Sequence, residues 1–482
     1  MPRGRTCPDP GGSAPGLIGR PARKGGAEPH RLGILSATMA YLPNGADDRR
    51  QMLEAIGAAS VDELFASVPD LLRHPRLELP EPLAEQDLVA ELARLAARNH
   101  PMGGLDSFLG AGVYRRYIPA IVRAAVARPE FYTAYTPYQA EASQGTLQTI
   151  FEFQSMICAL TGLEVANASL YDGATAAAEA VMMAVAHTGR ARVVAAADLH
   201  PETLAVIRTY ARGRGVEVLT AGDVGRAVGD GDACIVVARP GFLGTVDDVE
   251  PAVQAARGAG AVSICCADPI ACALLAPPGD LGFDIAVGDG QPLGVAPSFG
   301  GPHLGFMAVR QELMRRMPGR LVGLARDHHG RRAYALTLQA REQHIRREKA
   351  TSNICTNHAL TALAATVYMA RMGAGGLRRV AEVSAQRAHN LAARLGALDG
   401  VGLAEPARPF LWEFALQVPG DADAFARTMR REGIVAGLPL GGIDPGRRDQ
   451  LLVCCTETTT PASMDRYVAA AARAVAPLGV SS

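Results

Sequence analysis

The chain has 482 residues, which is enough for two or three domains with sizeable hydrophobic cores. Its 48 basic and 48 acidic residues give a formal net charge of zero, so no overall attraction to nucleic acid or to a membrane surface is expected. No apolar run reaches the roughly 18 residues that a membrane span needs. The composition therefore predicts a soluble globular protein.

The nine cysteines include two adjacent pairs, Cys265-Cys266 and Cys454-Cys455, and lie mostly within apolar runs. No CxxC pair occurs, so reduced and buried cysteines in a cytoplasmic protein are expected rather than disulfides or a zinc site. The adjacent pair His328-His329 does not easily share one ion, and no carboxylate follows at a matching spacing. We therefore expect no bound metal.

Lysine is nearly absent from the chain. Of the 48 basic residues, 46 are arginine and only Lys24 and Lys349 are lysine. If a bias in composition has replaced lysine by arginine, the lysines that remain are those that arginine cannot replace. Lys349 is therefore a candidate functional residue. The scarcity also restricts any mechanism that needs an amine nucleophile.

The N-terminal segment differs in composition from the rest. Residues 1–38 contain eight Gly and six Pro and no hydrophobic periodicity, so they are expected to be disordered, with Met39 a plausible true start. Residues 39–100 predict a helical arm. Its clearest helix spans Glu85–Asn99, where Leu88, Leu92 and Leu95 share one face.

Between residues 101 and 350, short apolar strands alternate with helices, which predicts a large α/β domain with a mostly parallel sheet. The expected helices are Gln144–Thr161, Ala174–His187, Pro201–Arg214 and Val249–Ala259. The expected strands are Arg192–Ala196, Glu217–Thr220, Ala233–Ala238, Val262–Ala267, Ile285–Val287 and Leu304–Val309. Residues 351–482 predict linking helices, Asn357–Met372 and Gly376–Arg394, followed by a smaller α+β domain.

Three short motifs follow the order of a pyridoxal-phosphate site in aminotransferase-like enzymes. Such a site needs a phosphate-binding turn, a group that stacks on the ring, an Asp that pairs with the ring nitrogen, and an imine-forming Lys. The turn Asp172-Gly173-Ala174-Thr175 opens a helix, His200 follows a strand, and Asp268 directly follows Val262–Ala267. Each match alone is weak, because an Asp after a strand is more often a cap and a His is more often structural.

The fourth element is missing. Where the lysine is expected, the chain reads Gly288-Asp289-Gly290-Gln291-Pro292, and arginine is a poor imine former. The carboxylate of Asp172 would also repel a phosphate. The chain therefore keeps the architecture of a cofactor domain without a working cofactor site of its own.

Two other stretches are dense in functional groups. Tyr132–Gly145 gathers three Tyr and several hydroxyl and amide groups around Pro137, which suits either an interface or a surface loop that caps the next helix. Arg341–Thr356 holds four Arg or Lys cations, its His344 and two Glu; its default interpretation is a solvated helix face. The amide and hydroxyl residues that follow the charges, and Lys349 itself, favour a functional or subunit-interface role. The loop Gly300–Gly305 is one where the backbone must approach something closely.

These segments together resemble one family. The similarity covers nearly everything from Met39 onward, and its most specific motifs are Tyr135–Gly145 and Arg341–Thr356. The segments that carry it are Met39–Pro43, Glu54–Pro69, Tyr135–Gly162, Val165–Ala180, Gly288–Gly305 and Arg341–Thr356. The chain is similar to the N-terminal half of the glycine cleavage system P-proteins, a half that some organisms make as a separate alpha subunit, subunit 1.

The resemblance implies a fold of the aminotransferase class (type I of the pyridoxal-phosphate enzymes) and a role in glycine dehydrogenase (decarboxylating, aminomethyl-transferring). It implies that pyridoxal 5'-phosphate and its lysine belong to a partner beta subunit in an α2β2 assembly. That assembly would decarboxylate glycine and pass the aminomethyl group to lipoylated H-protein, alongside the T- and L-proteins of the same system. Residues expected to shape a shared cleft or interface are Tyr135, Tyr138, Gln139, Glu141, Arg341, His344, Arg346, Arg347, Lys349 and Asn353.

Two alternatives stay open at this point. The chain could be a pseudoenzyme that scaffolds or regulates a complete enzyme, or a lone pyridoxal-phosphate enzyme that uses Lys349. The second is easier to reject, because Lys349 lies beyond the predicted sheet in a cationic segment. The resemblance itself implies that Asp172, Gly173, Thr175, His200 and Asp268 are relics of a cofactor site that the alpha subunit has lost.

Overall fold

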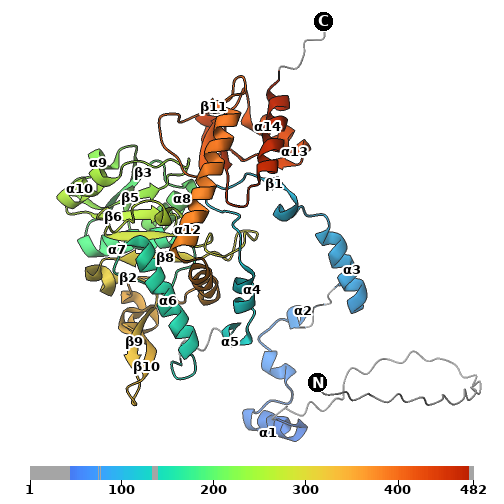
Figure 1. Ribbon diagram of the computed structural model, residues 1–482. Coiled ribbons are helices and arrows are strands. Elements are labelled where there is room, and N and C mark those ends of the chain that lie inside the picture. The colour runs from blue at the N-terminus through green and yellow to red at the C-terminus, as the bar shows by residue number, and fades with distance from the viewer. Residues whose placement is uncertain (1–43, 74, 76–77, 133–138, 477–482) are drawn as a thin grey trace, which may run out of the picture. The chain divides into compact units, whose positions relative to one another are not determined.

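The computed structural model describes residues 44–73, 75, 78–132 and 139–476 (Figure 1). The chain divides into two compact parts, one ending at Ala96 and the other beginning at Ala97. The first part is helical, with α1 (Ala46–Ile56), η1 (Asp62–Phe65), α2 (Asp70–Arg73) and α3 (Glu85–Ala96). None of these elements buries a residue, and the predicted apolar face of α3 is exposed at Leu88, Leu92 and Leu95.

The second part is built on a seven-stranded sheet, as the sequence predicts. Its strand order is β2-β8-β7-β6-β5-β3-β4, and β8 alone runs in the direction opposite to the other six strands. The strands are β2 (Val165–Ala166), β3 (Arg192–Ala196), β4 (Glu217–Ala221), β5 (Asp232–Arg239), β6 (Val262–Ala267), β7 (Ile285–Asp289) and β8 (Gly305–Val309). The predicted α/β class with a mostly parallel sheet is therefore confirmed.

Helices cover both faces of this sheet. Successive residues of β8 point to opposite faces, so Phe306 joins one hydrophobic cluster and Met307 the other. The first cluster includes α6 (Gln144–Thr161) and α12 (Ala359–Leu395), and the second includes α7 (Gly173–Thr188), α8 (Pro201–Arg212) and α10 (Glu250–Gly258). A sheet covered on both faces explains why its strands read as continuous apolar runs.

The long helix α12 runs from the large sheet to the C-terminal region (Figure 1). The sequence predicts two helices here, and Gly373 breaks the helical geometry with φ 62° and ψ 176°. The C-terminal region has an antiparallel sheet of order β11-β12-β15-β14. Its elements are β11 (Gly402–Leu403), β12 (Glu413–Gln417), α13 (Ala422–Arg431), β14 (Leu438–Pro439), β15 (Gln450–Cys454) and α14 (Pro461–Val475).

Several elements were not anticipated from the sequence. The strands β9 (Leu321–Arg326) and β10 (Arg332–Thr337) form a hairpin outside the large sheet. A short strand β1 (Asp106–Ser107) pairs in parallel with β13 (Ile434–Val435), so an early segment joins the C-terminal region. The helices α4 (Ala120–Val126) and α5 (Pro129–Tyr132) lie between β1 and α6.

Within the described part of the chain, no helix is long and apolar enough to cross a membrane. The same residues contain no group of three or more His, Cys, Asp and Glu side chains placed to hold a metal ion. The rings of His328 and His329 lie 3.7 Å apart in the turn between β9 and β10.

Candidate functional site

The turn at the start of α7 is closed by carboxylates of the chain itself. Asp172 caps the helix: its Oδ1 accepts a hydrogen bond from the Thr175 amide at 2.7 Å, and its Oδ2 accepts one from the Thr175 hydroxyl at 3.0 Å. The Gly173 amide donates to Oδ2 of Asp289, at the end of β7, at 3.0 Å. The amides of Gly173 and Thr175, which could face an anion at an open helix N-terminus, therefore already have partners.

Asp289 gathers three donors around this turn. Besides the Gly173 amide, its carboxylate accepts from the Gln291 amide at 2.8 Å and faces Nδ1 of His303 at 3.0 Å. The hydrogen bond with Asp289 raises the pKa of His303. A Cβ on Gly173 would lie 2.8 Å from the Asp289 nitrogen, so only glycine allows this close approach. With two carboxylates present, the turn is electrostatically unsuited to a phosphate.

Gln291, at the position expected for the lysine, is completely buried. Its Oε1 accepts from the Tyr114 amide at 2.9 Å, and its Nε2 donates to the carbonyls of Tyr114 at 3.0 Å and Val295 at 2.6 Å. The amide side chain therefore has both ends satisfied by backbone. Gln291 therefore has a structural role, because it links these backbone segments and neither end of its amide lacks a partner.

His200 and Asp268 also have internal partners. Nδ1 of His200 accepts from the Glu202 amide at 3.2 Å at the start of α8, and its Nε2 lies 3.0 Å from the Ala111 carbonyl oxygen. Oδ1 of Asp268 accepts from the amides of Ile270 at 2.7 Å and Ala271 at 3.0 Å. Burial raises the pKa of Asp268, although Arg116 and these amides favour its charged form. Both residues therefore form hydrogen bonds within the chain itself.

A buried polar cluster that sequence reasoning missed lies beside these residues. Glu413 accepts from the Ala111 amide at 2.6 Å and from the Tyr114 hydroxyl at 2.5 Å. Burial raises the pKa of Glu413 from 4.5 to about 7, against the lowering effect of these two donors. Burial and the nearby Glu413 charge also raise the pKa of Tyr114. Nothing local in the sequence marks this pair, because the two residues lie far apart along the chain.

Arg116 completes the cluster. Its Nη1 donates to Glu457 at 2.8 Å and to the Ser384 hydroxyl on α12 at 2.7 Å. Its guanidinium carbon lies 4.8 Å from the centre of the Trp412 ring, a distance that permits a cation–π interaction. The Arg116 side chain is 1% exposed, so this ion pair is shielded from water.

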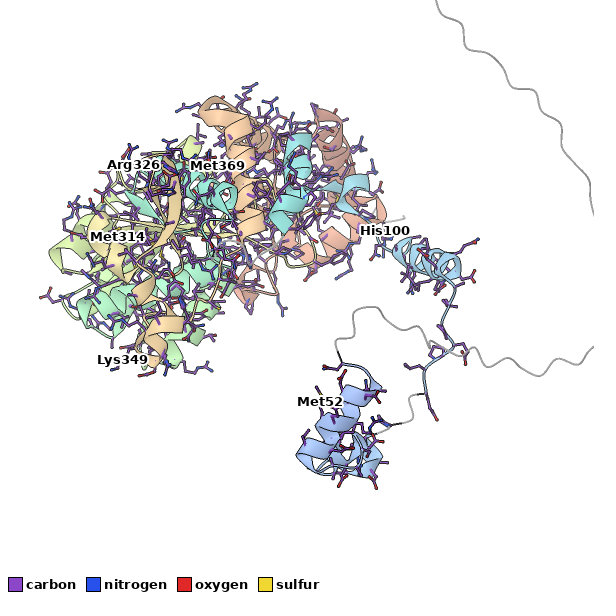
Figure 2. All side chains as sticks on the ribbon, turned by 90° about the horizontal axis from the view of Figure 1, so that it is seen from below. Met52, His100, Met314, Arg326, Lys349 and Met369 are labelled. Atoms are coloured by element: carbon purple, nitrogen blue, oxygen red, sulfur yellow. The ribbon has the colours of Figure 1, made fainter. Side chains whose placement is uncertain are left out.

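The cationic stretch after β10 is not one continuous helix. It forms three single turns, η6 (Gln339–Arg341), α11 (Gln343–Arg346) and η7 (Arg347–Lys349). Arg346, Arg347 and Lys349 are exposed and make no salt bridge or side-chain hydrogen bond with any residue that the structure describes. Lys349 lies at the outer edge of the part that begins at Ala97 (Figure 2).

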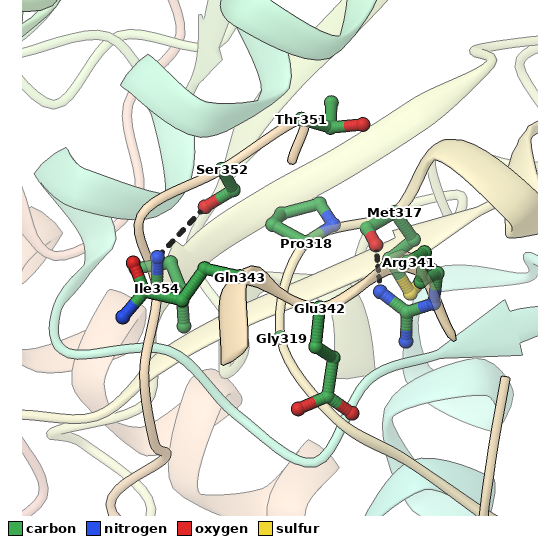
Figure 3. A pocket seen from close by; sticks show the side chains of 9 residues that line it. All are labelled: Met317, Pro318, Gly319, Arg341, Glu342, Gln343, Thr351, Ser352 and Ile354. Atoms are coloured by element: carbon green, nitrogen blue, oxygen red, sulfur yellow. Dashed lines mark hydrogen bonds between the residues drawn. The ribbon is translucent and has the colours of Figure 1, made fainter. Parts of the chain in front are cut away.

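The same stretch lines a small pocket (Figure 3). Its nine lining residues are Met317, Pro318, Gly319, Arg341, Glu342, Gln343, Thr351, Ser352 and Ile354. Arg341 donates from Nη1 to the Met317 carbonyl, and burial lowers its pKa. Nε and Nη2 of Arg341 and Oε1 of Glu342 are buried and have no hydrogen-bond partner among the described residues. His344 lies outside, its Nδ1 3.7 Å from Oε2 of Glu342.

The other predicted interface residues are only partly described. Tyr135 and Tyr138 lie outside the described residues. Gln139 and Glu141 are exposed just before α6, and Asn353 is exposed beside the pocket. Gln144, at the start of α6, exchanges two hydrogen bonds of 2.9 Å with the backbone of Tyr334 in β10. The hairpin therefore contacts the start of α6, and no hydrogen bond or ion pair among the described residues joins the Gln139–Glu141 stretch to the pocket lining.

The residues present do not fit bound pyridoxal phosphate. The imine-forming position holds Gln291, whose side chain is bonded to backbone on both ends. The candidate phosphate turn is occupied by Asp172 and Asp289. Both ring nitrogens of His200 and Oδ1 of Asp268 have partners within the chain.

Comparisons with known proteins converge on one family. A family model described as the glycine cleavage system P-protein matches residues 39–470. A protein of Thermomicrobium roseum is 46% identical over 449 residues, which cover 91% of this chain and 100% of the relative. A protein of Chlorobium limicola is 48% identical, with 90% of this chain and 100% of the relative covered. Both relatives are named probable glycine dehydrogenase (decarboxylating) subunit 1.

Solved structures agree with this. A crystal structure of a glycine decarboxylase (P-protein) of the glycine cleavage system, in inhibitor-bound form, matches with a TM-score of 0.81 and 45% identity, covering 90% of this chain and 99% of that one. The sphingosine-1-phosphate lyase of Burkholderia pseudomallei matches with a TM-score of 0.60 at 18% identity, covering 85% of this chain and 94% of that one. At that identity the likeness concerns the fold alone.

Proposed function

The chain belongs to the glycine cleavage system P-protein family, and we propose that it is the alpha subunit of a heteromeric glycine decarboxylase whose pyridoxal phosphate is held by a partner beta subunit. The observation that carries the proposal is Gln291, which stands buried and fully bonded where the imine-forming lysine is expected. The relatives' designation as subunit 1 supports a partner chain.

In this proposal the assembled enzyme removes the carboxylate of glycine as carbon dioxide and transfers the aminomethyl group to the lipoyl group of H-protein. This chain contributes no group that reacts with the cofactor. Its part is to complete the cleft and support the partner, in an α2β2 arrangement. A pseudoenzyme that merely scaffolds a complete enzyme is the less favoured alternative, because the relatives are named as a subunit of the enzyme itself.

Reconstitution tests the proposal. This chain and its partner are purified separately and mixed, and exchange of the glycine carboxyl group with labelled bicarbonate is measured. We expect exchange only in the mixture, and pyridoxal phosphate only on the partner. Full activity of the partner alone would support the scaffold alternative. An absorbance band at about 410–430 nm in this chain alone, lost in Lys349→Ala, would instead support a lone enzyme.

We further propose that the cationic stretch contacts the partner. Arg346, Arg347 and Lys349 project three exposed cations from consecutive single turns, and the adjacent pocket holds buried polar atoms of Arg341 and Glu342 without described partners. Buried polar groups of this kind are costly unless they are satisfied. A partner surface with carboxylates and hydrogen-bonding groups would complement both, since arginine pairs well with carboxylates.

Arg347→Ala tests this contact. The variant should fold normally but co-purify less with the partner, losing several-fold in affinity and in exchange activity at low partner concentration. Arg427→Ala, which removes an exposed cation from α13, is the matched control and should have no effect. If Arg347→Ala assembles and turns over like the wild type, the stretch is a solvated surface, where an ion pair is worth about 0–1 kcal/mol.

A further inference from the structure

We propose that residues 110–117, called the strap segment here, form a built-in plug that fills the former cofactor pocket and fastens the two sheets together in the cofactor's place. The proposal rests on the proposed function, in which the cofactor belongs to the partner. It goes further by stating that the pocket stays closed even when a lysine is restored at position 291.

The strap segment bonds to two of the three relic positions that follow the α7 turn in the chain, His200 and Gln291. Ala111 bonds to His200 through its carbonyl at 3.0 Å, and Tyr114 bonds to Gln291 through both its amide and its carbonyl, at 2.9 and 3.0 Å. The residues at the ring-stacking and imine-forming positions, His200 and Gln291, therefore both bond to one stretch of the same chain.

The strap segment is also hydrogen-bonded to the C-terminal region. Glu413 of β12 accepts from the Ala111 amide at 2.6 Å and the Tyr114 hydroxyl at 2.5 Å. Glu457, after β15, accepts from Arg116 at 2.8 Å and from the Tyr117 amide at 2.6 Å. The segment is thus a polar bridge between the large sheet and the antiparallel sheet.

The backbone of the strap segment passes close to side chains at Gly110 and Gly112. A Cβ on Gly110 would lie 2.3 Å from Oε1 of Glu413 and 2.7 Å from Cβ of Cys454. Gly112 has φ +91°, and a Cβ there would lie 3.2 Å from Cδ2 of His200. Glycine at these two places lets the backbone pass between side chains of both regions. Lifting the segment would leave Gln291 and Glu413 buried without the partners that Ala111 and Tyr114 supply, which disfavours opening.

Gln291→Lys in the assembled complex tests the plug. Bound pyridoxal phosphate is released with alkali and counted per alpha–beta pair, and a second sample is reduced with borohydride and digested. An imine forms when the lysine amine condenses with the cofactor aldehyde and releases water, and borohydride then fixes it as a peptide adduct. We expect one cofactor per pair in both wild type and variant, and no adduct at position 291. A second cofactor, or an adduct on residue 291, would overturn the plug.

Hydrogen exchange of the wild-type complex provides a test that does not depend on how the variant folds. The amides of Ala111 and Tyr114 should be protected, and adding free pyridoxal phosphate should leave their exchange unchanged. Exchange as fast as that of the His328 amide would refute the plug, because His328 is exposed in the β9–β10 turn and its amide donates no hydrogen bond to any described residue. The two proposals fail separately: two cofactors per wild-type pair would refute the proposed function, whereas one in the wild type and two in Gln291→Lys would refute the plug alone.

Discussion

Replacing Glu413 by glutamine should remove a definite part of the pH dependence of stability. Burial raises the pKa of this carboxyl from 4.5 to about 7. The folded protein therefore holds a proton on Glu413 over a range where the unfolded chain has lost it. Between those two values the folded state binds more protons, so its stability falls as pH rises and levels off above about 7.

The size of the effect follows from the two pKa values. A shift from 4.5 to about 7 corresponds to about 3 kcal/mol of stability lost between pH 5 and 8. Burial also raises the pKa values of Glu179, Asp198 and Asp268, so the wild type carries their contributions as well. The difference between wild type and Glu413→Gln isolates the single carboxyl.

The assay is denaturant unfolding of wild type and Glu413→Gln at pH 5, 6, 7 and 8. Glutamine places an amide near the Ala111 amide and the Tyr114 hydroxyl, which adds a constant cost of about 1–3 kcal/mol at every pH. The difference in the free energy of unfolding between wild type and Glu413→Gln should therefore become smaller as pH rises. Glu432→Gln, at a glutamate whose side chain is 44% exposed, should show no such change. If the free energy of unfolding changes with pH in the same way for wild type and Glu413→Gln, the assignment of the raised pKa to Glu413 is refuted.

Other substitutions probe contacts of different strength. Arg116→Met should lower the free energy of unfolding by about 3–5 kcal/mol, because Glu457 is left nearly buried without its cation. Arg116→Met combined with Glu457→Gln should recover much of that loss in denaturant unfolding, and no recovery would mean that the ion pair itself is not the cause. Asp172→Ala should cost about 1 kcal/mol through loss of the α7 cap, whereas Asp172→Asn should retain most of the stability. Equal melting temperatures for these two variants and the wild type would show that the cap contributes nothing. Gly173→Ala should lower the melting temperature, because its Cβ would lie 2.8 Å from the Asp289 nitrogen, and an unchanged melting temperature would contradict that close packing.

For three elements with strong local patterns, the sequence predicted the first and last residues. The helix Gln144–Thr161 and the strands Arg192–Ala196 and Val262–Ala267 have the predicted bounds. Their apolar periodicity or continuous apolar runs match burial on one helix face or on both sheet faces. The β9–β10 hairpin escaped prediction because charged and half-exposed residues interrupt its apolar pattern.

The candidate site likewise has features that could be predicted from the sequence and features that could not. The absence of a lysine near Gln291 could be seen in the sequence, because it depends on residue identity and chain order alone. The hydrogen bonds between Gln291 and Tyr114 could not be predicted, and neither could the contact between Ala111 and Glu413. Those pairs are separated by 177 and 302 positions, so no local pattern signals them.

By itself the sequence determined the class of fold, the order of the motifs that resemble a cofactor site and the absence of a lysine at the expected imine-forming position, since these follow from periodicity and residue type. Only the tertiary structure decided which partners these positions have. Packing brings the early segment 110–117 between the large sheet and β12, where Gln291 and Glu413 bond to it from either side. A buried amide and a buried carboxyl must find partners, and the fold supplies them from distant parts of the chain.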